Sequence, residues 1–82
     1  MNDHSETEST KILDVRPLLE RGEPPFSLIS ETVDELKPGQ DFLLITPFEP
    51  YPLYLELGKR GYKYSASFRD DGDWDIRFTP AS

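Results

Sequence analysis

Apolar residues recur along the chain with two different periods, one typical of helices and the other of strands. The first helical pattern steps by three, four and three residues, which lines its apolar positions along one helix face. These positions are Phe26, Ile29, Val33 and Leu36. The pattern predicts a helix from Pro24 or Pro25 to about Lys37, because Pro38 and Gly39 then end it.

A second helix is predicted from about Pro50 to Arg60. Leu53 and Leu57 lie one turn apart in it, and Gly61 fits a left-handed C-terminal cap. Both helices open with prolines, which suit a first helical turn because the N–H group that proline lacks has no partner there. The prolines therefore mark where each helix begins.

Short apolar runs predict the first two strands. Ile12 to Val15 is expected to be a short strand, and the following stretch from Pro17 to Gly22 is interpreted as a loop. Phe42 to Ile45 has no polar alternation, which predicts a central strand buried on much of both faces.

The C-terminal part predicts a β-hairpin, because apolar residues alternate with polar ones over residues 62–68 and 74–78. A two-residue turn would set the two apolar faces on opposite sides of the ribbon. A three-residue loop over residues 70–72, with Gly72 in the left-handed conformation, brings them to the same side. This register pairs Phe68 with Trp74, Ala66 with Ile76 and Tyr64 with Phe78, and it sets Arg69 beside Asp73 for a modest attraction.

The predicted element order is βαβαββ. Strands joined by a helical crossover pair in parallel, whereas a hairpin is antiparallel. The fold class is therefore α/β, an α+β two-layer sandwich with a four-stranded mixed sheet and two helices on one face. The domain is expected to span residues 11–79, after a disordered tail at residues 1–10 that holds the only histidine, His4.

Charge and composition exclude several classes of function. Sixteen acidic and nine basic residues give a formal charge of −7, and the scattered basic residues argue against nucleic-acid binding. The chain has no cysteine, which excludes disulfides and thiolate chemistry. No leader or membrane span is recognised, so a cytoplasmic protein without membrane contact is expected. An edge strand offers a route to dimerisation, but the acidic charge favours a monomer.

Six short motifs carry a resemblance to a known superfamily. In order they are Leu13-Asp14-Val15-Arg16, Glu23-Pro24-Pro25, Leu36-x-Pro38-Gly39, Leu43-Leu44-Ile45, Pro50-x-Pro52-Leu53 and Arg60-Gly61. From about Ile12 to Phe78 the chain resembles the TusA/SirA-like sulfur carriers, and more closely an uncharacterised branch of them known only as a conserved domain of unknown function. The resemblance implies the same βαβαββ sandwich.

The resemblance also implies where a reactive residue would stand. In the sulfur carriers a cysteine at the start of the first helix accepts a persulfide, and this cysteine corresponds to Gly22, while the last proline of its motif corresponds to Pro25. Sulfur relay by this chain alone is not expected, because only a thiolate carries a persulfide. The uncharacterised branch often has a histidine before its second helix, where this chain has Phe48.

Four charged residues are predicted to gather where strands end and helices begin. They are Asp14, Arg16, Glu23 and Glu49. Such a cluster suits a small ligand or proton transfer. The alternative is structural: a carboxylate before a proline-opened helix caps its free N–H groups, or the four residues take part in structural ion pairs, as Asp14 does with Arg16.

A second candidate is an aromatic and proline surface at the start of the second helix. Its members are Phe48, Pro50, Tyr51 and Pro52. Rigid apolar surface of this kind is typical of protein docking, and the alternative is a well-packed corner. The leading hypothesis is a non-catalytic sulfur-carrier-like domain that contacts an unidentified protein partner, and the alternative is a small-ligand or acid/base site. No cofactor is expected, and the acidic residues 70–73 are expected to form a solvated turn, not a metal site.

Overall fold

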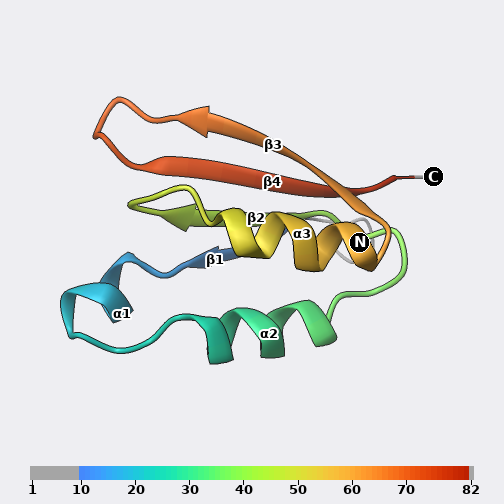
Figure 1. Ribbon diagram of the computed structural model, residues 1–82, viewed down its shortest axis with the longest axis horizontal. Helices are drawn as coiled ribbons and strands as arrows, with labels where there is room; N and C mark the ends of the chain where they lie inside the picture. Colours follow the sequence, from blue (N-terminus) through green and yellow to red (C-terminus); the bar gives the residue numbers. More distant parts are fainter. Residues whose placement is uncertain (1–9, 82) are drawn as a thin grey trace, which may run out of the picture.

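The computed structural model describes residues 10–81 (Figure 1). In chain order its elements are β1 (Lys11–Asp14), α1 (Arg16–Glu20), α2 (Phe26–Asp34), β2 (Phe42–Thr46), α3 (Tyr51–Lys59), β3 (Tyr62–Phe68) and β4 (Trp74–Pro80). The tail expected at residues 1–10, with His4, lies outside the described residues except for Thr10.

The four strands form one mixed sheet in the order β1-β2-β4-β3. β1 and β2 are parallel, and β4 is antiparallel to its neighbours β2 and β3. α2 and α3 lie on the same face of this sheet (Figure 1). Their apolar side chains share one hydrophobic core with it. The predicted two-layer α+β sandwich with a four-stranded mixed sheet is confirmed, and α1 is an additional helix that was not expected.

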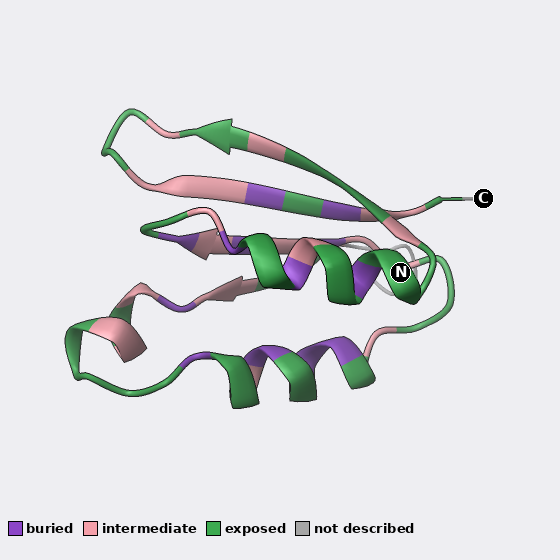
Figure 2. Ribbon diagram, in the orientation of Figure 1, coloured by how far each residue is buried: buried purple, intermediate pink, exposed green. Residues whose placement is uncertain are grey.

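The core lies between the two central strands and the two longer helices (Figure 2). Phe42, Leu44, Ile76 and Phe78 supply its sheet side, and Ile29, Val33, Leu53 and Leu57 supply its helix side. Burying side chains of this size stabilises the fold by roughly 1.5–3 kcal/mol each. On the other face of β2, Leu43 and Ile45 are half-buried, which agrees with the expectation of a central strand buried on much of both faces.

The segment from Pro17 to Gly22 was expected to be a loop, and that prediction is wrong. Pro17 stands in the first turn of α1, where its missing N–H costs nothing. Gly22 has φ +75° and ends the helix in a Schellman motif. In this motif the N–H of Gly22 bonds the carbonyl of Leu19 at 3.0 Å, and the N–H of Glu23 bonds that of Leu18 at 2.9 Å.

α2 is shorter than its sequence pattern predicts, whereas α3 agrees with its predicted range, since Pro50 and Arg60 are its cap residues. α2 covers nine residues and ends at Asp34. It therefore stops before Lys37, whose helical conformation is disfavoured because Pro38 follows it. Phe26, at its first position, is exposed, so it does not complete the apolar face. After α3 ends, Gly61 has φ +89°, which confirms the predicted left-handed cap.

The hairpin has the predicted register. Phe68 pairs with Trp74, and Gly72 has φ +91° in the loop between them. The N–H of Arg69 bonds the carbonyl of Asp73 at 2.7 Å, which closes the predicted three-residue loop. The expected side-chain attraction between Arg69 and Asp73 is wrong, because the Arg69 guanidinium binds other aspartates.

Candidate functional site

The four charged residues proposed from sequence occupy three separate places. Asp14 and Arg16 form an ion pair. Glu23 pairs instead with Arg21, at 3.1 Å. Glu49 accepts hydrogen bonds from two tyrosine hydroxyls on α3. Neither α2 nor α3 has a side-chain cap, so capping by the two glutamates is wrong, whereas the ion-pair form of the structural alternative is observed for Glu23 and Asp14.

Arg16 joins the end of β1 to the hairpin loop. Its Nε and Nη2 bind the Asp14 carboxylate at 2.9 and 2.8 Å, a two-point contact that fixes both side chains. The backbone N–H of Arg16 bonds the same carboxylate at 3.0 Å. Its Nη1 reaches Asp71 and Asp73, each at 3.1 Å, more than fifty residues away in the sequence.

Arg69 extends this cluster across the hairpin. It binds Asp71 at 3.1 Å through Nε and Asp75 at 2.7 Å through Nη1. Asp71 therefore bridges Arg69 and Arg16. We call the six residues Asp14, Arg16, Arg69, Asp71, Asp73 and Asp75 the hairpin-tip network. It holds four aspartates and two arginines, so it is formally anionic.

The arginines keep two of these carboxylates ionised. The side-chain hydrogen bond from Arg16 holds the pKa of Asp14 below its ordinary value, and the one from Arg69 does the same for the pKa of Asp71. The aspartates in turn raise the pKa of Arg16. A general acid or base works best with a pKa near the working pH. The network is therefore better suited to holding β1 against the hairpin than to moving protons.

A cleft of about 460 Å³ borders the network between α1 and the loop after β2. Asp14, Arg16 and Asp73 form its charged wall, and Pro17, Leu19 and Pro47 contribute apolar surface. This mixture can hold a small polar molecule, but Arg16 meets such a molecule with its charge already paired.

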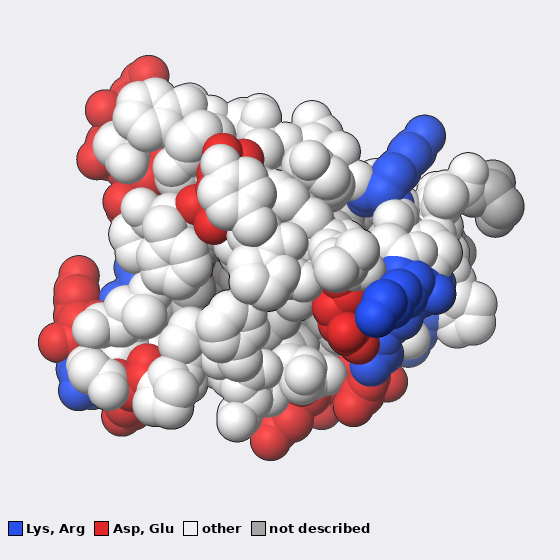
Figure 3. Space-filling view, in the orientation of Figure 1, with Lys and Arg blue, Asp and Glu red and all other residues white. Residues whose placement is uncertain are grey.

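Exposed aromatic rings gather on the helix-covered side, from the start of α3 to the end of β3. Phe48 is 42% exposed, Tyr51 64%, Tyr64 50% and Phe68 67%. We call these four rings the aromatic surface. Figure 3 shows uncharged side chains over most of the middle of this side, with acidic atoms mainly around its margin. Of the prolines proposed with them, Pro52 is exposed, but Pro50 is buried, so that part of the expected surface is wrong.

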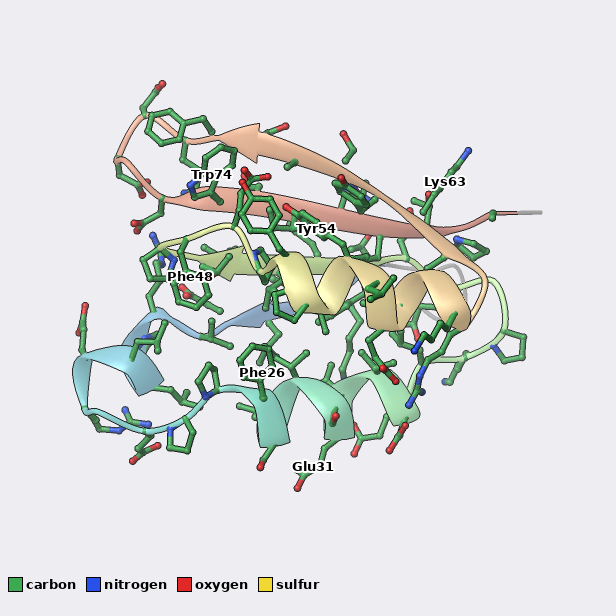
Figure 4. All side chains as sticks on the ribbon, viewed as in Figure 1. Phe26, Glu31, Phe48, Tyr54, Lys63 and Trp74 are labelled. Carbon is green, nitrogen blue, oxygen red and sulfur yellow. The ribbon has the colours of Figure 1, made fainter. Side chains whose placement is uncertain are left out.

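Ring contacts hold three members of the aromatic surface, Tyr51, Tyr64 and Phe68, in place. Half-buried Tyr54 stacks on Tyr64 with ring centroids 3.7 Å apart and meets Tyr51 edge to face at 5.7 Å. Phe68 packs edge to face on Trp74 at 5.1 Å. Figure 4 shows Phe48, Tyr54 and Trp74 around the start of α3 and the adjoining hairpin. Rings fixed this way lose little further freedom when a partner covers them.

Glu49 anchors two of these tyrosines. Its carboxylate accepts the Tyr51 hydroxyl at 2.8 Å and the Tyr54 hydroxyl at 2.9 Å. Burial is the main cause that raises the pKa of Tyr54, and the hydrogen bond to Glu49 raises the pKa of Tyr51. Both hydroxyls therefore remain protonated donors at neutral pH. Glu49 positions aromatic rings, a role that the sequence reasoning missed.

A family model matches residues 12–80 of the chain. The chain belongs to the DUF2249 family of uncharacterized conserved proteins. No curated protein and no solved structure matches the chain. The DUF2249 match begins in β1 and ends in β4, so the hairpin-tip network and the aromatic surface both lie inside this domain.

Among residues 10–81, no three His, Cys, Asp or Glu side chains are grouped so as to hold a metal ion. None of the helices in that range combines the length and the apolar character needed to cross a membrane.

Proposed function

We propose that this DUF2249 domain is a non-catalytic, TusA/SirA-like sulfur-carrier relative that works in the cytoplasm by docking onto a protein partner. The observation that carries the proposal is the aromatic surface, where Phe48 and Tyr51 leave large ring areas in water at the start of α3. Aromatic side chains dominate the energetics of protein interfaces when a partner covers them.

The surroundings of Gly22 support a non-catalytic role. In the resemblance this residue stands where sulfur carriers have their cysteine, but here it ends α1 with φ +75° and precedes the start of α2 by four residues. A side chain at this position lacks the helix N-terminus that lowers the pKa of a thiol. Pro25, the other motif position, is the buried N-terminal boundary residue of α2.

The direct test is affinity capture with the tagged full chain and a Phe48→Ala, Tyr51→Ala double variant. We expect a protein partner that the wild type retains and the double variant loses. The matched control is Ile12→Ala, which removes an exposed apolar side chain from the opposite face of the sheet. Circular dichroism checks that each variant is folded.

Two outcomes oppose this proposal. A partner that binds the double variant as tightly as it binds the wild type would show that the aromatic surface is not part of the contact. A partner lost equally with Ile12→Ala would indicate non-specific apolar capture.

The second candidate function is a small-ligand or acid/base site at Asp14 and Arg16, and the cleft of about 460 Å³ favours it. The lowered pKa of Asp14 argues against proton transfer, so ligand binding is the stronger form of this candidate. A thermal-shift screen of small charged compounds on wild type and Asp14→Asn tests it. A compound that raises the Tm of the wild type alone would support ligand binding in the cleft. Equal Tm shifts for wild type and Asp14→Asn would oppose it.

A further inference from the structure

β3 is an edge strand that is long and almost free of charge. It has seven residues and pairs with β4 on one side only, while β1, at the other edge, has four residues. Natural edge strands are usually shortened or protected by several charges, because their free N–H and C=O groups otherwise recruit another strand. The only charged side chain within β3 is Lys63, near one end.

The register shows which backbone groups of β3 face outward. The N–H of Arg69 bonds the carbonyl of Asp73, and the N–H of Ala81 bonds the carbonyl of Gly61, at 2.7 and 2.8 Å. Hydrogen-bonded pairs alternate with non-bonded pairs along an antiparallel ladder. Odd-numbered residues of β3 therefore bond β4, and even-numbered residues direct their N–H and C=O groups to the open edge. The outward residues are Tyr62, Tyr64, Ala66 and Phe68.

The same residues carry the exposed rings. Tyr64 and Phe68 belong to the aromatic surface, and the small side chain of Ala66 lies between them in the strand. A strand paired with this edge would set every second side chain beside these rings, at the spacing of a normal cross-strand pair. Ala66 leaves room for one of those side chains. The backbone contact and the aromatic contact would thus belong to one interface.

The charge around the end of β3 indicates the kind of strand that fits. A hollow of about 490 Å³ is lined there by Phe68, Arg69 and the three aspartates Asp70, Asp71 and Asp75. Asp71 and Asp75 already pair with Arg69, but three carboxylates against one guanidinium leave the hollow with a net negative charge, which favours a lysine or arginine side chain of a partner. A second copy of the chain is disfavoured, because each copy carries a formal charge of −7.

We propose that the outer edge of β3 binds an extended, lysine- or arginine-rich segment of a partner protein as a fifth strand of the sheet. This inference rests on the proposed docking function and specifies its partner. Backbone hydrogen bonds to the even-numbered residues supply the affinity, and cationic side chains in the hollow select basic partners.

The test starts with a random decapeptide library displayed on phage and selected against the full chain. We expect enriched peptides that place Lys or Arg where the paired strand passes the hollow at the end of β3 and that contain no proline in the strand. Their binding is then compared for wild type, Ala66→Pro and Ala66→Ser. Proline removes an outward N–H without touching the ladder to β4, whereas serine keeps this N–H. Ala66→Pro should weaken binding by about tenfold or more, and Ala66→Ser should leave it unchanged.

Amide hydrogen exchange gives an independent readout of the same edge. In the free protein the amides of Tyr64, Ala66 and Phe68 should exchange faster than those of Ser65 and Ser67, which bond β4. Added peptide should slow the first group and leave the second unchanged. Affinity should also fall as salt is added, because the contact is partly ionic.

Three results would overturn this inference. Peptides that bind the Ala66→Pro variant as tightly as the wild type would exclude strand addition. The docking function would still hold in that case if the Phe48→Ala, Tyr51→Ala variant loses its partner. Selection of acidic or proline-rich peptides would contradict the basic partner. A wild-type dimer in sedimentation experiments that Ala66→Pro converts to a monomer would make a second copy the occupant.

Discussion

Replacing either Gly22 or Gly58 by alanine adds the same methyl group but should change stability in opposite directions. A Cβ atom at either position meets no other atom within 4 Å, so contacts do not decide the outcome. Gly22 has φ +75°, where alanine is strained by about 1 kcal/mol. Gly58 lies within α3, where alanine is the better helix former and should stabilise the fold by about 0.5 kcal/mol.

The stabilities of the two glycine variants are measured by urea and thermal unfolding, with far-UV circular dichroism as the signal. For a domain of this size 1 kcal/mol corresponds to about 4–8 °C in Tm, so Gly22→Ala should lower Tm by about that amount and Gly58→Ala should raise it by about half as much. Gly22→Cys should lose as much as Gly22→Ala. A Gly22→Ala protein as stable as wild type would refute the Schellman ending of α1 as the reason for glycine there.

Three further predictions concern the network, the anchored tyrosines and the core. The pKa of Asp14 is lower in the folded than in the unfolded protein, so its ionised form stabilises the fold. This stability is fully present above the unfolded pKa of about 4 and is lost as pH falls through the lower, folded pKa. Asp14→Asn should therefore be less stable than wild type at pH 7, with a difference that shrinks by pH 3 in urea unfolding; a constant difference would contradict this. Glu49→Gln should lower the pKa of Tyr51 in an ultraviolet titration, and an unchanged titration would remove Glu49 as the cause. Leu57→Ala should cost about 2–5 kcal/mol, whereas exposed Leu55→Ala should change stability little, as measured by urea unfolding; similar losses would contradict the burial of Leu57.

The parts of the fold that follow from local rules could be predicted from the sequence. The hairpin register follows from parity alone, because only one loop length puts Phe68 and Trp74 on the same face. The sequence also held the signals for α1, with Pro17 near its start and Gly22 after its end. The apolar periodicity of a five-residue helix is too short to be recognised, so only this pair of end signals marks it.

The candidate sites depend on distances that no local pattern contains. Arg16 meets Asp71 only because the hairpin loop lies over the end of β1, 55 residues further along the chain. Alternation placed Tyr64 and Phe68 on the apolar face of the hairpin. Their exposure depends on how the helices pack over the hairpin, which alternation along one strand does not contain.

The position of the only tryptophan gives the domain an internal optical probe. Trp74 is half-buried and touches exposed Phe68, one of the outward residues of β3, with ring centroids 5.1 Å apart. A strand that covers Phe68 also removes water from the indole and shifts its fluorescence emission to shorter wavelength, whereas unfolding exposes the indole and shifts the emission to longer wavelength. Unlabelled protein therefore distinguishes partner binding from unfolding by the direction of a single spectral change.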